Sequence, residues 1–512
     1  MPVWNFLQRS VYQDSVTLMR LTHDMEAVAG VRQAAAMMGT PANRALLAQA
    51  GLLDAQGERA GPGDLVIAIV ADGAAAAEAA RAIAEAGLAA PRPAPVSGAA
   101  SPRTLAGGLR ALPGATLALI SVPGAYAGAE ARRALDAGLH VMLFSNNVPL
   151  ETEVELKQVA TARGLFLMGP DCGTAILAGV PLGFANAVPR GRIGLVAASG
   201  TGLQEVSCRL AAEGEGVSHA IGVGGRDLSD AVGGAMTLTA LAALADDPAT
   251  AVVVVVGKPP GPDVARSLAE ALNALGKPSV VYTAGATVGR SGGPHVHRAA
   301  TLEDAALAAV ALARGQTPRG VEFSRPADEI DRLVAKHARA LGSGQRFVRG
   351  VYSGGTLAWE AVTLLGARLS GVVPGVRGEG DGHRVVDLGD DVHTLGRPHP
   401  MIDGSSRRER IAREAADPAT AVVLLDVVLG YGAHPDPTAE LGPEIEAARR
   451  AAAAAGRGLA VVASVIGTEA DPQGRSRQAA ALRQAGAVVM DSNAQAARLA
   501  ALVAARAGDG GR

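Results

Sequence analysis

Asp247-Pro-Ala-Thr-Ala-Val-Val253 recurs in this chain as Asp417-Pro-Ala-Thr-Ala-Val-Val423. Each copy leads into an apolar run and a Gly/Pro-rich turn, which is the pattern of a strand buried on both faces of a parallel sheet. Upstream of the copies, Ser199-Gly-Thr-Gly-Leu-Gln-Glu205 and Ser353-Gly-Gly-Thr-Leu-Ala-Trp-Glu360 each predict a turn that opens a helix. Downstream, each copy is followed by a helix and a further strand. We therefore expect the same doubly wound α/β unit twice, at 188–315 and 346–512, joined by a connector at 316–344.

The first third of the chain predicts two smaller domains. Residues 1–90 favour a small α+β domain, and the prolines between 89 and 102 mark a linker, because they can continue neither a helix nor a central strand. From 101 to 187, short apolar runs alternate with helical stretches, as in βαβ units. The expected strands are 15–21, 65–70, 116–122, 140–145 and 165–168, the expected helices are 41–50, 74–86, 128–137 and 151–162, and 24–38 fits either state.

Composition excludes several classes of protein. The chain has 512 residues, 48% hydrophobic, 19% charged and only 3% aromatic, with a formal net charge of −2. Such a chain is globular, needs several cores, and has no global field to attract nucleic acid. Its two cysteines, Cys172 and Cys208, cannot make a disulfide framework. The longest apolar run, 251–257, is too short to span a bilayer. With no signal-like segment in 1–15, we expect a cytoplasmic protein that binds no membrane.

The turn at Ser199-Gly200-Thr201-Gly202 is the strongest candidate binding site. It follows an apolar strand at 193–196 and starts a helix, so backbone N–H groups and the positive end of the helix dipole converge on one point. Glycines let an anion approach the backbone closely. The alternative is a capping box between Thr201 and Gln204 that only starts the helix. Since a similar turn occurs in each repeat, we favour phosphate.

A second anion site is predicted at Gly430-Tyr431-Gly432. This loop follows the apolar strand of the second repeat, where ligands bind in open α/β sheets. The chain has no Walker A sequence and no GxGxxG after a strand, so an ordinary nucleotide site is not visible. No GxSxG elbow or Ser-His-Asp spacing supports hydrolase chemistry.

Charged residues in loops give further candidates, each with a structural alternative. Arg226 could bind a carboxylate or phosphate beside Asp227, or make a surface salt bridge. Lys258 follows a buried strand, and could equally be a solvated lysine. Arg397 and His399 lie in a loop stiffened by prolines, which favours a catalytic role. The carboxylate of Glu469, with Asp471 nearby, could orient a substrate or cap a helix.

A metal site is not predicted. His295 and His297 flank one valine and would lie on one face of a short strand. No third ligand lies near them in the sequence, so we interpret them as polar strand residues.

Longer strings show a family resemblance. Met168-Gly-Pro-Asp-Cys-Gly-Thr174, the 193–205 segment and Gly222-Val-Gly-Gly225 resemble loops of the succinyl-CoA synthetase α subunit, and 424–435 resembles the phosphate loop of its β subunit. The whole chain resembles the FdrA proteins, in strings such as 37–43, 386–391, 396–403 and 466–473. The resemblance implies a truncated Rossmann-like CoA-binding-type domain at 101–187 and flavodoxin-like synthetase-type domains at 188–315 and 346–512.

The departures from the synthetase pattern concern its phosphohistidine. The expected GHAGA loop would follow the strand at 278–282, but the segment 284–293 there contains no histidine. Lys258 matches the glutamate that supports the phosphohistidine, which reverses the charge. The Gly-rich CoA loop and an ATP-grasp domain have no counterpart, so we expect no required cofactor and doubt binding of CoA or nucleotide.

The resemblance implies a carbamoyl or acyl-phosphate transferase. FdrA relatives are associated with purine and allantoin degradation and with oxamate carbamoyl transfer, in which oxalurate and phosphate give oxamate and carbamoyl phosphate. This reading predicts phosphate or carbamoyl phosphate as substrate, further enzyme subunits as partners, and an oligomer. The alternatives are an NDP-forming acyl-CoA synthetase subunit, with its nucleotide part on another chain, and a non-catalytic scaffold that binds a metabolite.

Overall fold

The computed structural model describes residues 2–9, 11, 13, 15–89, 102–284, 293, 295–394 and 398–509, which form two units. The first unit comprises residues 1–114 and 391–398, and the second unit comprises residues 115–390 and 399–512. The first unit contains an antiparallel sheet in the order β1-β3-β2. Its elements are β1 (Val3–Gln8), α1 (Ser15–Glu26), β2 (Val31–Met38), α2 (Pro41–Gln49), η1 (Gly57–Arg59), β3 (Leu65–Ala71), α3 (Ala74–Ala89), α4 (Leu105–Ala111) and α13 (Asp391–Thr394).

The N-terminal prediction was partly wrong. The segment predicted as a strand at 15–21 is the start of α1, because Leu18, Leu21 and Met25 recur at helical spacing and all three are buried. The strand β1 was missed. The helices predicted at 41–50 and 74–86 and the strand at 65–70 are confirmed as α2, α3 and β3. Most of the proposed linker, residues 90–101, lies outside the described residues.

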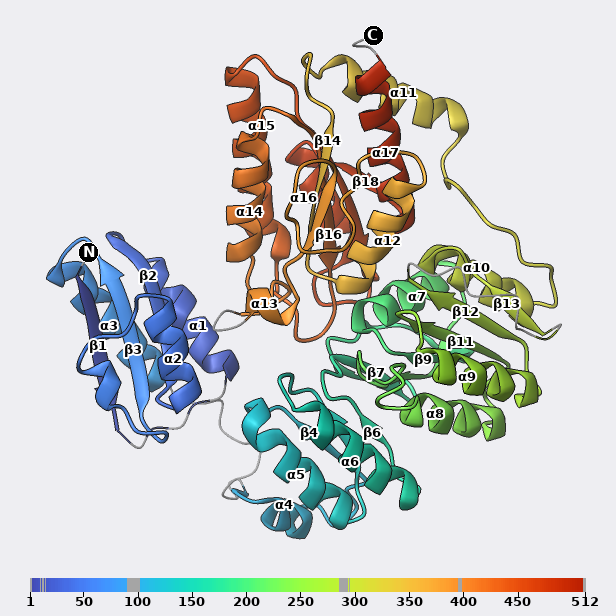
Figure 1. Cartoon of the computed structure of the whole chain (residues 1–512), viewed down its shortest axis with the longest axis horizontal. Coiled ribbons are helices and arrows are strands. Elements are labelled where there is room, and N and C mark those ends of the chain that lie inside the picture. Colours follow the sequence, from blue (N-terminus) through green and yellow to red (C-terminus); the bar gives the residue numbers. More distant parts are fainter. Residues whose placement is uncertain are drawn as a thin grey trace. The chain divides into compact units, whose positions relative to one another are not determined.

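The second unit begins with a three-stranded parallel sheet in the order β4-β5-β6 (Figure 1). This is the truncated Rossmann-like arrangement that the sequence predicts. An unpredicted hairpin follows, and its first strand pairs antiparallel with β10, at Ile176 and Ala220, so the hairpin extends the next sheet. The elements are β4 (Leu117–Ile120), α5 (Gly124–Asp136), β5 (His140–Leu143), α6 (Leu150–Ala162), β6 (Leu167–Met168), β7 (Thr174–Leu177) and β8 (Val180–Gly183).

The two repeats have the same strand order. The first sheet runs β13-β12-β11-β9-β10-β7-β8 and the second runs β15-β14-β16-β17-β18. Without the added hairpin, both follow the 2-1-3-4-5 order of flavodoxin-like folds. The first repeat contains β9 (Arg190–Ala197), α7 (Gly200–Ala212), β10 (Val217–Gly222), α8 (Ala235–Asp246), β11 (Val252–Gly257), α9 (Pro262–Ala274), β12 (Ser279–Thr283), β13 (Val296–Arg298) and α10 (Leu302–Ala313).

The second repeat contains β14 (Phe347–Tyr352), α12 (Gly355–Gly366), β15 (Arg384–Asp387), α14 (Ser405–Ala416), β16 (Thr420–Val428), α15 (Pro437–Ala454), β17 (Ala460–Ile466), α16 (Arg475–Gln484), β18 (Val488–Met490) and α17 (Asn493–Asp509), and α11 (Ala327–Arg339) lies in the connector before it. The repeated sequence leads into the equivalent central strands β11 and β16. In each copy the aspartate accepts a hydrogen bond from the amide two residues on, at 3.1 Å for Asp247 and 2.9 Å for Asp417. The duplication is confirmed.

The two repeats share one hydrophobic core. Helices α7 and α10 of the first repeat pack against α12 and α17 of the second. Their contact surfaces are rich in buried alanine, which lets helices approach closely and explains how a chain with few aromatic residues builds a large core. Among the described helices, none is long and apolar enough to cross a membrane.

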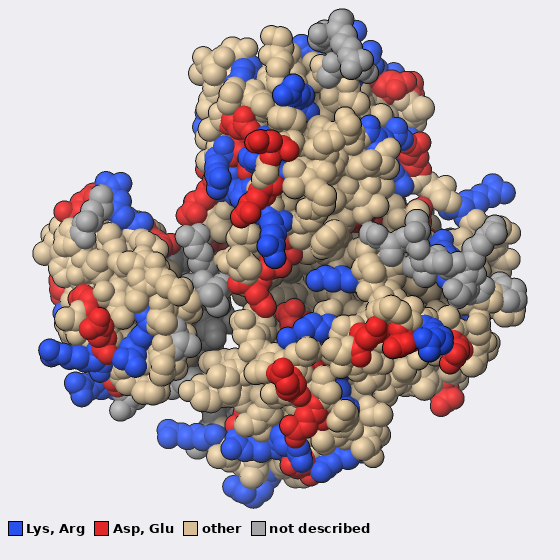
Figure 2. Space-filling view, in the orientation of Figure 1, with Lys and Arg blue, Asp and Glu red and all other residues tan. Residues whose placement is uncertain are grey.

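The charged surface is mixed in sign. Figure 2 shows Lys and Arg interspersed with Asp and Glu on the face in view, in keeping with 47 basic and 49 acidic residues in the chain. No single-sign field of the kind that attracts a nucleic-acid backbone is visible there.

Candidate functional site

The start of α7 has the geometry of an anion site. Ser199 is the N-cap, and its hydroxyl accepts a hydrogen bond from the amide of Gly202 at 2.9 Å. The amides of Gly200 and Thr201 belong to the first turn and have no acceptor within the helix. The alternative of a Thr201–Gln204 capping box is wrong, because Gln204 points elsewhere: its Nε2 donates to the carbonyls of Phe184 and Leu429 at 2.6 and 3.0 Å.

The start of α12 lies against the start of α7. A Cβ atom built on Gly354 would lie only 2.7 Å from Thr201 Oγ1, so the helix starts meet where one residue has no side chain. Each start carries partial positive charge, which favours an anion wherever no carboxylate of the protein already occupies the turn. This junction joins the two repeats of one chain.

In the second repeat the turn already holds an internal anion. The amides of Ser353 and Gly354 donate to the carboxylate of Asp426 at 2.9 Å, and the Ser353 hydroxyl donates to it at 3.0 Å. The buried guanidinium of Arg407 lies 3.1 Å from Asp426. Burial raises the pKa of Asp426 and Arg407 opposes that rise. The two turns are therefore not equivalent, and the α7 turn is the one available to an external anion.

Asp387, at the end of β15, lies at the same junction and was not among the predicted site residues. Its Oδ1 accepts from the Gly389 amide at 2.9 Å, and its Oδ2 lies 2.5 Å from the position of a Cβ on Gly355, the first residue of α12. Burial raises the pKa of Asp387 to about 7, while the charge of Lys258 lowers it. The exposed Lys258 thus acts electrostatically on this carboxyl. The sequence could have indicated Asp387, because it lies in the 386–391 string at the end of a strand.

His399 is close to Asp387 through Gly389. Its Nδ1 accepts from the Met401 amide at 3.2 Å, and its Nε2 lies 2.8 Å from the position of a Cβ on Gly389. Burial lowers the pKa of His399 to about 4, so the imidazole is neutral at pH 7. With Nδ1 accepting, the proton is on Nε2, which can donate a hydrogen bond. Arg397, the predicted companion of His399, lies outside the described residues.

The Gly430–Gly432 loop is mostly used by the protein itself. The amide of Gly430 donates to Gln473 Oε1 at 3.1 Å, and that of Tyr431 donates to the Ala185 carbonyl at 3.0 Å. A Cβ on Gly430 would meet the Ala185 and Phe184 carbonyls at 2.7 Å, and its φ of +120° also requires glycine. The loop therefore packs on the segment between β8 and β9, and neither amide is open to a ligand.

Arg226 and Asp227 belong to a buried ionic network. Arg226 Nε lies 2.7 Å from Glu153, as in the salt-bridge alternative, although half of its side chain is exposed. Asp227 is fully buried and accepts from Lys157 at 2.8 Å and from the amide and hydroxyl of Thr237 at 2.9 and 2.6 Å. Asp227 thus holds the start of α8, and its carboxylate faces the interior rather than a substrate.

Glu469 and Asp471 also have structural partners. Glu469 accepts from the amide and the hydroxyl of Ser476 at 2.9 and 2.5 Å, and so caps the first turn of α16. Asp471 accepts from the amides of Ala187 and Thr468 at 2.7 Å each. The helix-capping alternative describes Glu469, while Asp471 ties the segment before β9 to the end of β17.

The histidine pair and the cysteines show no sign of a reactive site. His297 lies in β13, as the strand interpretation predicts, but His295 lies in a turn just before that strand, so the prediction was only partly right. In the described part of the chain, no group of three or more His, Cys, Asp or Glu residues could hold a metal ion. Both cysteines are buried, and burial raises the pKa of Cys172 to about 12, so its thiol stays protonated.

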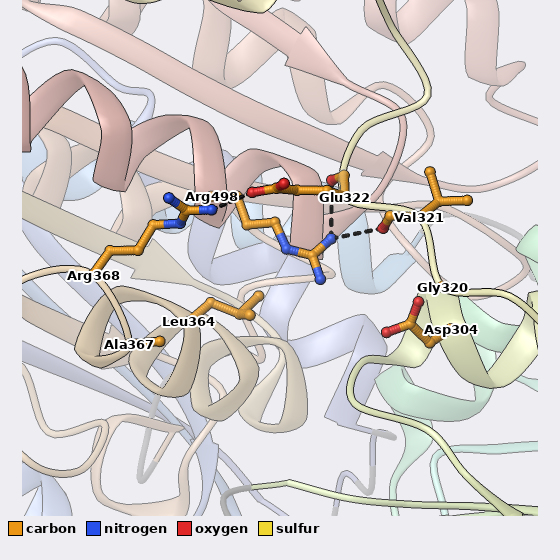
Figure 3. Close-up of a pocket in the computed structure, with 8 residues that line it drawn as sticks. All are labelled: Asp304, Gly320, Val321, Glu322, Leu364, Ala367, Arg368 and Arg498. Atoms are coloured by element: carbon orange, nitrogen blue, oxygen red, sulfur yellow. Dashed lines mark hydrogen bonds and ion pairs between the residues drawn. The ribbon is translucent and has the colours of Figure 1, made fainter. Parts of the chain in front are cut away.

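A pocket of about 360 Å³ lies away from the predicted residues (Figure 3). Arg498 donates to the carbonyls of Val321 and Glu322 at 3.0 Å each, and Arg368 pairs with the Glu322 carboxylate. Arg498, Arg368 and Glu322 therefore already have protein partners, and the pocket is a hollow between the connector and the helices α12 and α17.

Together, the repeated sheets and their facing helix starts define an enzyme-like fold of the CoA-ligase class. Residues 351–503 match the CoA-ligase family, and residues 1–102 match the family described as AllF, heavy metal-associated domain. The succinate–CoA ligase [ADP-forming] α subunit of Staphylococcus aureus (strain Mu50) is 32% identical over 181 residues, 34% of this chain and 58% of that subunit. A dinucleotide-forming acetyl-coenzyme A synthetase of Ca. Korarchaeum cryptofilum aligns with a TM-score of 0.32 at 16% identity, over 76% of this chain and 83% of that chain.

YahF of Escherichia coli (strain K12) is 38% identical over 510 residues, covering 96% of this chain and 97% of YahF. The chain therefore belongs to the same family as YahF, the FdrA-like relatives of succinyl-CoA synthetase.

The heavy-metal description of the N-terminal match does not fit the residues present. Residues 1–102 contain no cysteine and a single histidine, His23, whereas soft metals bind preferentially to thiolates. The only cysteines of the chain lie in the second unit. We derive no metal chemistry for this domain.

Proposed function

We propose that this chain is an acyl-transfer subunit of the acyl-CoA-synthetase type, which binds the phosphoryl part of an acyl phosphate at the start of α7. The observation that carries the proposal is the meeting of the α7 and α12 helix starts, where Asp387 lies against the first residue of α12, His399 lies against Gly389, and the charge of Lys258 acts on the Asp387 carboxyl. The matches to CoA ligases favour this reading over carbamoyl transfer. Any nucleotide-binding part would belong to another chain.

Each group at the junction has a role in the proposed reaction. The first amides of α7 and the ammonium of Lys258 would bind the phosphoryl oxygens. The Nε2–H of His399 would donate to the charge that develops on the acyl oxygen, and a single such donor is worth about 2.7–4 kcal/mol in the transition state. Asp387, with its pKa of about 7, would take the proton of the attacking thiol. The thiol sulfur bonds to the acyl carbon, the bond between that carbon and the bridging phosphate oxygen breaks, and inorganic phosphate leaves.

The direct test is conversion of an acyl phosphate and CoA to acyl-CoA and phosphate by the purified chain with its neighbouring-gene subunits. Acyl-CoA formation that disappears in Lys258→Ala, with the fold intact, would support the proposal. Binding of acyl phosphate without any turnover, with partners present, would favour the metabolite-binding scaffold instead.

Carbamoyl transfer is the second candidate, and one observation favours it. The segment 284–293, which follows β12, contains no histidine, so a phosphohistidine cannot form there. Transfer of a carbamoyl group between oxamate and phosphate needs no such carrier, because phosphate is itself a substrate. Consumption of labelled carbamoyl phosphate only when oxamate is added would establish this reaction, and consumption only with CoA would exclude it.

A further inference from the structure

Two buried glutamates cap helices across the boundary between the repeats. Glu205 of α7 accepts a hydrogen bond from the amide of Asn493, the first residue of α17, at 3.2 Å. Glu360 of α12 accepts one from the amide of Leu302, the first residue of α10, at 2.7 Å. Since α7 and α10 belong to the first repeat and α12 and α17 to the second, each carboxyl caps a helix of the opposite repeat. The arrangement is reciprocal.

Asn493 joins the two carboxyls. Its backbone N–H donates to Glu205, and its side-chain Nδ2 donates to Glu360 Oε2 at 2.8 Å. A third carboxyl, Glu303 of α10, accepts from Ser492 Oγ at 2.7 Å and Gln495 Nε2 at 2.8 Å, at the start of α17. Three carboxyls from three helices therefore meet at one inter-repeat contact.

Three arginines act on this cluster. Arg209 lies 3.3 Å from Glu303 and also acts on Glu205, Arg475 acts on Glu205 more weakly, and Arg498 acts on Glu303. The buried phenols of Tyr282 and Tyr352 and the buried thiol of Cys208 also face the cluster. Moreover, Asn493 Oδ1 is buried and has no hydrogen-bond donor. A carboxylic acid proton is a donor that the fully ionised cluster lacks.

We propose that Glu205 and Glu360 are positioning residues, which hold the starts of α7 and α12 face to face by reciprocal capping, and that this clamp loosens when their carboxyls ionise. Both glutamates lie on the same two helices that begin at the anion site. If α7 or α12 moved relative to the helix that its glutamate caps, Thr201 and Gly354 would separate. The link to anion binding rests on the proposed function, whereas the clamp itself does not.

The direction of the pH effect follows from burial. Burial, helped by repulsion between the carboxyls, raises the pKa of Glu205 to about 7 and that of Glu360 to about 8, well above the unfolded value of 4.5, and outweighs the capping N–H groups, which oppose the rise. A carboxyl with a raised folded pKa contributes stability below its unfolded pKa, and this contribution is lost as pH rises through the folded pKa. The clamp is therefore intact at every pH well below 7 and loosens as the pH rises through about 7 and about 8.

The test compares the full chain with Glu205→Gln and Glu360→Gln, which mimic the protonated carboxyls, and with Glu270→Gln as a control on the exposed face of α9. Thermal unfolding without ligand is measured from pH 6 to 9, and sulfate, which does not titrate in this range, is the probe of anion binding. We expect the wild-type Tm to fall by roughly 5 °C from pH 6.5 to 9. We expect its sulfate Kd to rise about tenfold over the same pH range, a change equal in free energy to a shift of one pKa unit.

Each Gln variant should make both profiles less steep than in the wild type, since the other glutamate and Asp387 still titrate, while Glu270→Gln should follow the wild type. Parallel Tm profiles in all four proteins would overturn the clamp. A failure of every protein to bind sulfate would instead count against the proposed anion site, since the Tm profiles still decide the clamp. If a Gln variant does not fold, hydrogen exchange of the Leu302 and Asn493 amides in the wild type replaces it: protection that does not decrease from pH 6.5 to 8.5, after correction for intrinsic rates, would contradict the proposal.

Discussion

Thr201 and Gly354 meet at the boundary between the two repeats, and a Cβ on Gly354 would lie 2.7 Å from Thr201 Oγ1. These residues belong to the two turns that the sequence predicts as equivalent. They are adjacent in space because α7 and α12 pack against each other. The first four predictions concern this junction.

Gly354→Ala should force the two helix starts apart and weaken sulfate or phosphate binding. The added methyl would clash with three side-chain atoms of Thr201, and overpacking of this kind typically costs about 1–3 kcal/mol. Gly366→Ala, at the other end of α12, has no atom within 4 Å of the new methyl and is the matched control. Urea unfolding and isothermal titration calorimetry measure the two effects. Equal stability and equal anion affinity of Gly354→Ala and Gly366→Ala would show that the close approach of Gly354 to Thr201 is unimportant.

An anion should bind at the start of α7. A crystal soaked in sulfate or phosphate should show density at the amides of Gly200 and Thr201, and Gly200→Val should weaken binding by excluding the anion. The valine side chain would also approach Thr174 Oγ1, which lies 3.3 Å from the built Cβ, so unfolding must be measured in parallel. Density at other sites only would contradict the site.

Asp387→Asn should remove the pH dependence of turnover near pH 7. If Asp387 is the general base, wild-type kcat/KM rises with pH through about 7, because only the ionised carboxyl accepts a proton. The stability effect has the opposite sign: the raised pKa makes the folded state less stable as pH rises through 7, and the variant lacks this loss. Asp331→Asn, at an exposed position of α11, is the control. An unchanged pH profile in Asp387→Asn would assign the base elsewhere.

Lys258→Ala should abolish turnover and leave stability unchanged. Lys258 is exposed, so its removal costs little packing, but its charge acts at the junction. Lys336→Ala, an exposed lysine of α11, should retain full activity. Steady-state kinetics and thermal unfolding of both variants distinguish a catalytic charge from a solvated one, and full activity of Lys258→Ala would establish the latter.

Lys157→Met should destabilise the second unit strongly. Lys157 is fully buried and bridges Glu153 and Asp227 at 2.8 Å each, and removing one partner of a buried ion pair costs about 3–5 kcal/mol. Arg226→Ala removes a half-exposed partner of the same Glu153 and should cost much less stability. Chemical denaturation of both variants gives the comparison. If Arg226→Ala also stops turnover with the fold intact, Arg226 has the predicted catalytic role as well.

The fold was largely predictable because its signals are local. Apolar runs of strand length, the repeated 247–253 and 417–423 strings and the turns before α7 and α12 lie within short windows of sequence. The errors occurred where the local pattern is ambiguous. The 15–21 segment alternates like a strand but also places Leu18, Leu21 and Met25 on one helix face, and packing in the core decides for the helix.

The sequence by itself determined that the chain contains the same α/β unit twice, with an anion-type turn at the same place in each. It also located Lys258 and His399 at strand or loop ends. Only the tertiary structure decided that Asp426 fills the second turn and that Asp387 joins the site. Only the packing of the repeats shows that Glu205 and Glu360 cap each other's repeat. The physical reason is range: strand and turn propensities act between neighbours in sequence, whereas burial, pKa shifts and capping partners depend on which distant side chains exclude water from one another.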